Sequence, residues 1–142
     1  MTSIEKIFND NDFITRNKSP ETSITEIENT IDFPLPDDYS NFLLKYELFE
    51  GTIGPQYFQL WDIENLIPIN NEYSIFSNLD KTLGIGTNLS GELIAIENFG
   101  IDQHRIVLTP FIDLSKEYNL TIGDSFTDFL IRLDSGKEWF ES

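Results

Sequence analysis

Three residues in the second half of this chain have the types needed for nucleophilic catalysis. Ser125, Asp124 and His104, the single histidine, contain the side chains of a hydrolase triad. The chain has no G-x-S-x-G nucleophile motif, and the spacing of these residues does not itself support a triad. We therefore expect a surface or strand-end role for His104.

Two carboxylate pairs, Asp37-Asp38 and Glu26 with Glu28, have the residue types of a glycosidase acid and base. Asp37 and Asp38 directly follow Pro36, a residue that suits the first turn of a helix. Carboxylates at a helix start are stabilised by the positive end of the helix dipole. We interpret both pairs as helix-start residues.

Metal and phosphate sites are incomplete in this sequence. Zinc sites typically take four ligands, most often including several histidines or cysteines, and this chain has one histidine and no cysteine. The stretch 10–12 (DND) begins like a calcium loop but lacks the glycine and the distal glutamate. The stretch 83–86 (LGIG) lacks the Lys-Ser/Thr of a phosphate loop. We expect no catalytic residue, metal or cofactor.

The charge of the chain is a stronger indication of its function than the incomplete catalytic, metal and phosphate motifs. It has 142 residues, 25 acids and 9 bases, with a net charge of −16. Such a surface repels nucleic acid and anionic membranes, and its natural partner is basic. The alternative is that the acidity only keeps the protein soluble. Between Ser19 and Asp80 there are 12 acids and one base, Lys45.

This base-poor segment supplies the candidate partner-binding residues, chosen on charge alone. They are Asp37, Asp38, Glu47, Glu50, Asp62, Glu64 and Glu72.

Within the same segment, the aromatic residues Tyr57, Phe58 and Trp61 have the chemistry of a stacking platform. Residues 57, 59 and 61 alternate with 58 and 60, as in a strand with one face in the core and the other face partly covered. We therefore expect Phe58 and Trp61 to belong to the core, together with Tyr39, Phe42 and Leu43.

Length and hydropathy favour a single domain over residues 1–142. The longest uninterrupted aliphatic run, residues 93–96, is far shorter than the roughly 20 residues of a membrane span. The N-terminus does not resemble a signal peptide. We expect a soluble, cytoplasmic protein, with a C-terminal tail at residues 137–142 in which Trp139 or Phe140 packs or frays.

The secondary-structure elements that would position these residues are mainly helices in the first half of the chain and mainly strands in the second half. The first half predicts helices near residues 3–8, 23–31, 36–46 and 62–67, with a capping box at Ser23 and Glu26. Gly51 and Gly54-Pro55 indicate turns, and residues 57–61 indicate a strand. Pro68 is expected to interrupt the helix that begins near residue 62.

The second half predicts strands at 83–87, 92–97, 105–109 and 120–122, then a helix that Ser125 caps. Hairpins between helices at both ends indicate an α+β fold, a mainly antiparallel sheet with helices packed against it.

The ordered set LPDDYSNFLLKY, GPQYFQLW, LGIGTN, ELIAIEN, IVLTPF and IGDSFTDFLIRL resembles the SUKH superfamily (Smi/Knr-type fold) over about residues 20–133. The turns at 48–51 and 88–91 depart from the glycine-rich turns of many members, which leaves the partner open. The resemblance implies a non-enzymatic α+β protein. Bacterial members are mostly immunity proteins encoded beside polymorphic or contact-dependent toxins.

The resemblance therefore implies binding and neutralisation of a cognate toxin domain, and the charge of this chain suggests a basic one, such as a nuclease. The alternative is a scaffold or regulatory interaction module, as in fungal relatives. No nucleic-acid, membrane or small-molecule partner is expected.

Overall fold

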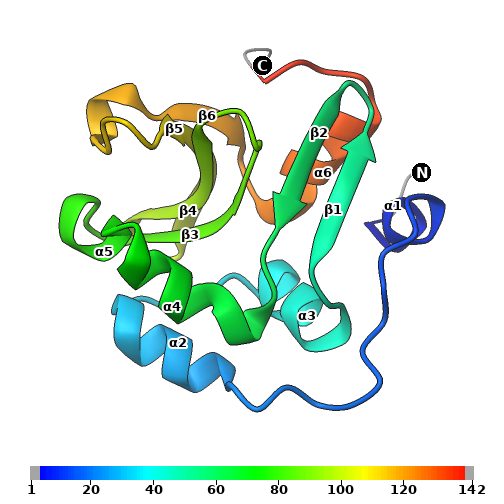
Figure 1. Cartoon of the computed structure of the whole chain (residues 1–142), viewed down its shortest axis with the longest axis horizontal. Coiled ribbons are helices and arrows are strands. Elements are labelled where there is room, and N and C mark those ends of the chain that lie inside the picture. Colours follow the sequence, from blue (N-terminus) through cyan, green and yellow to red (C-terminus); the bar gives the residue numbers. More distant parts are fainter. Residues whose placement is uncertain (1–3, 140–142) are drawn as a thin grey trace.

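The computed structural model describes residues 4–139. Within that range, six strands form one antiparallel sheet in the order β1-β2-β3-β4-β5-β6, so neighbours in sequence are neighbours in space. The strands are β1 (Phe49–Ile53), β2 (Gln56–Leu60), β3 (Thr82–Thr87), β4 (Glu92–Gly100), β5 (Gln103–Pro110) and β6 (Leu120–Gly123). Figure 1 shows that the sheet curls strongly.

Helices lie at both ends of the chain and between strands β2 and β3 (Figure 1). They are α1 (Ile4–Asp10), α2 (Ile24–Ile31), α3 (Asp37–Lys45), α4 (Ile63–Glu72), α5 (Ile75–Asn78) and α6 (Phe126–Asp134), with a 3-10 turn η1 (Lys116–Tyr118). The expected α+β class with an antiparallel sheet is confirmed.

Two predicted helix starts are also confirmed. Ser23 caps α2 through its side chain, which accepts a hydrogen bond from the Glu26 N–H, and Glu26 completes the capping box. Ser125 caps α6 in the same way, by accepting from the Asp128 N–H at 2.9 Å.

The core is rich in aromatic rings that come from distant parts of the chain. Phe13 stacks on Phe49 with ring centroids 4.0 Å apart, and Phe42 lies 5.1 Å from Phe126. Such ring pairs connect the N-terminal segment to β1 and α3 to α6. The expected core residues are all buried, namely Tyr39, Phe42, Leu43, Phe58 and Trp61.

Two sequence predictions, for Gly51 and for Pro68, are wrong. Residues around Gly51 form strand β1 rather than a turn, because Gly51 pairs with Phe58 across the hairpin and only Gly54-Pro55 make the turn. Pro68 lies inside α4 without ending it. Its side chain is exposed, while Leu66 and Asn70 on the buried side hold the helix against the sheet.

The predicted tail is packed at Trp139, whose ring stacks on Phe129 with centroids 6.2 Å apart. Phe140 lies outside the described residues. None of the helices in residues 4–139 is long and apolar enough to cross a membrane.

Candidate protein-binding surface

Three of the seven acids predicted from charge accept hydrogen bonds that hold the fold together. Asp38, in the first turn of α3, accepts from the backbone N–H and the hydroxyl of Thr127, both at 2.8 Å. Its other oxygen accepts from the Tyr39 N–H. Asp38 therefore joins the starts of α3 and α6.

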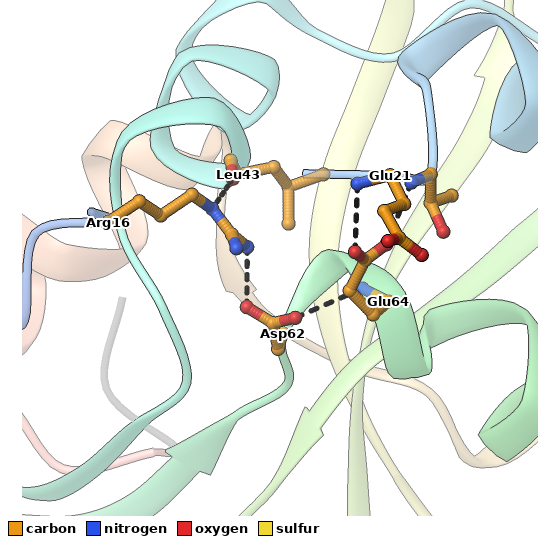
Figure 2. Close-up of polar contacts among 6 residues, drawn as sticks. Arg16, Glu21, Leu43, Asp62 and Glu64 are labelled. Atoms are coloured by element: carbon orange, nitrogen blue, oxygen red, sulfur yellow. Dashed lines mark hydrogen bonds and ion pairs between the residues drawn. The ribbon is translucent and has the colours of Figure 1, made fainter. Parts of the chain in front are cut away.

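Asp62 is the N-cap of α4 and accepts a hydrogen bond from the Glu64 N–H at 3.1 Å. Its second oxygen forms an ion pair with the Arg16 guanidinium (Figure 2). Arg16 also donates to the Leu43 carbonyl at 2.9 Å, so this one side chain connects the N-terminal segment, α3 and α4.

Glu64 holds the same segment one turn further along. Its carboxylate accepts from the backbone N–H groups of Glu21 and Thr22, both at 2.8 Å (Figure 2). The Thr22 side chain, followed by the backbone N–H groups of Glu21 and Thr22, lowers the pKa of Glu64 below its usual value, because these donors stabilise the ionised form. Asp62 and Glu64 thus connect residues 16–22 to the start of α4.

Glu50 lies on the exposed side of the β1–β2 hairpin and takes part in a chain of side-chain hydrogen bonds. It accepts from the Tyr57 hydroxyl at 2.5 Å and from the Gln59 amide at 3.0 Å. Gln59 in turn accepts from the Trp61 indole N–H at 2.9 Å. The bond to Glu50 raises the pKa of Tyr57, since it favours the protonated phenol.

The other three predicted acids, Asp37, Glu47 and Glu72, have no side-chain hydrogen bond or ion pair within residues 4–139. Asp37 and Glu72 are exposed, and Glu47 is half-buried. All three carboxylates are therefore available to an external partner. The predicted role of the seven acids in binding stays a prediction, and these three, with exposed Glu50, are the members best placed for it.

The basic residues of the chain do not offset these acids. Seven of the nine Lys and Arg side chains already form ion pairs with acids of this chain. The pairs are Lys6–Asp10, Arg16–Asp62, Lys45–Glu5, Lys81–Asp32, Arg105–Glu97, Lys116–Glu97, and Arg132 with both Asp124 and Asp128. The surplus charge presented to solvent is thus carboxylate.

A groove of about 360 Å³ lies between the end of β2, the second half of α4, the β3–β4 turn and the residue after β5. We call it the α4 groove. It is lined by Gln59, Trp61, Ile69, Glu72, Tyr73, Thr87, Leu89 and Phe111. Of these residues, the sequence predicted Trp61 as a core residue and Glu72 as a candidate binding residue. Tyr73 and Leu89, both about half-exposed in the structure, are brought to this groove by the fold, and no local pattern in the sequence indicates it.

The catalytic residue types considered above have other contacts. His104, near the start of β5, lies 3.0 Å from the Pro34 carbonyl oxygen and 3.3 Å from the Asn98 amide. No hydrogen bond joins His104 to Asp124 or Ser125 in the described part of the chain. Within the same residues, no cluster of three or more His, Cys, Asp or Glu side chains has the arrangement of a metal site.

Comparison with known proteins agrees with this architecture. The model of the SMI1 / KNR4 family (SUKH-1) matches residues 18–132, close to the range over which the sequence resembles the superfamily. A comparison with curated proteins found no match. The family match covers most of the chain and includes α2 to α6 and all six strands almost entirely. The chain therefore belongs to the SMI1 / KNR4 family (SUKH-1).

Proposed function

We propose that this protein is an immunity protein that binds a cognate toxin domain and neutralises it by covering its working surface. The observation that carries the proposal is membership of the family, which is in general a family of toxin-immunity-like proteins. On this proposal the chain works as one binding domain in the cytoplasm, without catalysis, metal or cofactor.

The charge supports a basic toxin, such as a nuclease. A nuclease holds its substrate through cationic side chains that contact phosphates. Carboxylates that have no partner among the described residues, such as those of Asp37, Glu47 and Glu72, are suited to occupy those cationic positions. Because the net charge is −16, long-range attraction would also speed the encounter, most strongly at low salt.

The test is coexpression with the toxin domain encoded by the gene adjacent to that of this protein. Growth should be restored, and the two purified chains should elute from a sizing column as one complex. Persistent toxicity together with separate elution of the two chains would reject the immunity function.

A matched pair of variants tests the role of charge. Glu72→Lys and Asp134→Lys change the net charge equally, but Asp134 lies at the exposed end of α6, outside the base-poor segment. Glu72→Lys should weaken protection, whereas Asp134→Lys should preserve it. Equal behaviour of the two variants would show that only overall charge matters.

A further inference from the structure

We propose that the α4 groove binds an arginine side chain of the partner protein, stacked on its aromatic wall and paired with Glu72. This inference rests on the proposed function, which it deepens by naming a recognition site.

Within residues 4–139, every polar side chain in the groove except those of Glu72 and Tyr73 has an intramolecular hydrogen-bond partner. Gln59 accepts from Trp61 and donates to Glu50. The Thr87 hydroxyl donates to the Glu92 carbonyl at 2.8 Å and accepts from the Leu89 N–H at 3.1 Å.

Glu72 is exposed and lines the groove, and no basic side chain from the described part of the chain lines it. The one charged group left to recognise a ligand is therefore a carboxylate, so the complementary ligand is a cation.

The walls favour a flat, delocalised cation. Tyr73 and Phe111 are in ring contact, with centroids 5.1 Å apart, and Trp61 lines the same groove. A guanidinium stacks on such rings within roughly 6 Å of a ring centroid. It also presents a fork of N–H donors that matches a carboxylate, which the ammonium group of lysine does not. Arginine therefore fits this site better than lysine.

A fixed loop closes one side of the groove. Leu89 has a left-handed backbone, with φ of 59°, which is uncommon for a large side chain. The buried side chain of Asn88 supports it by accepting from the N–H groups of Ser90 and Glu92, at 2.9 and 3.1 Å. Leu89 is thus held half-exposed beside the rings, where it can cover the aliphatic stem of an arginine.

The experiment uses the full chain and a blocked tripeptide with arginine at its centre. The chain has two tryptophans, so NMR resolves two indole N–H signals. Trp61 reports on the groove, and Trp139, packed against Phe58 and Phe129, is the internal control. The arginine peptide should shift the Trp61 signal saturably, the lysine peptide should bind more weakly, and the glutamine peptide should have no effect.

Glu72→Gln should weaken arginine binding about three- to fivefold, as expected for an exposed ion pair, while Asp134→Asn should leave it unchanged. An absent Trp61 shift, an equal shift with the glutamine peptide, or undiminished binding by Glu72→Gln would overturn the proposal. The outcome is separable from that of coexpression. If the protein protects cells but does not bind arginine, only the proposed groove site is overturned. If it binds arginine but does not protect cells, only the proposed immunity function is overturned.

Discussion

Asn70 and Gly84 are joined by two hydrogen bonds that hold helix α4 on strand β3. The Gly84 N–H donates to Asn70 Oδ1 at 2.7 Å, and Asn70 Nδ2 donates to the Gly84 carbonyl at 2.9 Å. Both residues are fully buried, and the β3–β4 register shifts between Gly84 and Gly86. The amide side chain thus takes the place of a strand partner at an irregular point of the sheet.

Replacement of Asn70 by leucine should destabilise the protein. Both backbone groups of Gly84 would lose their side-chain partner, at a cost of about 1–3 kcal/mol for each group left unsatisfied. Urea unfolding measures the change. Asn71→Leu is the matched control, because Asn71 is the next residue in α4 and is exposed. Equal stability of the two variants would show that the Asn70–Gly84 bonds contribute nothing.

Arg16 and Asp62, which form an ion pair, should be energetically coupled. Its side chains are only 11% and 16% exposed, so solvent screens the pair less than a surface pair. A double-mutant cycle with Arg16→Gln and Asp62→Asn, measured by urea unfolding, should give a coupling energy of about 1–3 kcal/mol. The single variants should also speed proteolysis within residues 16–22. A coupling energy near zero would contradict this role.

Glu64 should contribute to stability in mildly acidic solution. The pKa of Glu64 in the folded protein is lower than its value of about 4.5 in the unfolded chain. The contribution of Glu64 to folding stability is therefore present above pH 4.5 and is lost as the pH falls through the pKa of the folded state. Glu64→Gln should therefore be less stable than wild type at neutral pH, and the difference should shrink below pH 4.5. Melting temperatures across this range provide the measurement. A difference independent of pH would exclude the ionised carboxylate as its source.

Tyr39 should show the opposite pH dependence. Its ring is fully buried and its hydroxyl has no protein hydrogen-bond partner in the described residues. Burial and then the charge of Asp62 raise its pKa well above 10.0. Its contribution to stability is therefore fully present below pH 10.0 and is lost as the pH rises through the folded pKa.

Tyr39→Phe tests this dependence. The variant should be at least as stable as wild type at pH 7, because it buries no unsatisfied hydroxyl. It should lose less stability than wild type as the pH rises above 10.0, which unfolding at a series of alkaline pH values measures. Parallel loss in both proteins would assign the alkaline sensitivity to other residues.

The fold was predictable wherever local chemistry sets the structure. Ser23 with Glu26 and Ser125 identify their helix starts because the capping interaction lies within four residues of sequence. Strand β1 was missed because Glu50-Gly51 has no strand pattern of its own and depends on pairing with β2.

The candidate surface was predictable only in part, for a related reason. Charge alone does not distinguish Glu72, which has no side-chain partner within residues 4–139, from Asp38, whose partner Thr127 is 89 residues away. The α4 groove likewise needs Leu89 and Phe111, which the fold brings to Trp61 from distant parts of the sequence.

The central claim is that an acidic surface of this protein captures a basic toxin domain. The most direct measurement is the association rate constant of the two purified proteins over a series of salt concentrations. The rate should be high at low salt and fall steeply as salt is added, and Glu72→Lys should lower it more than Asp134→Lys. An association rate independent of salt, or no association at all, would contradict the claim.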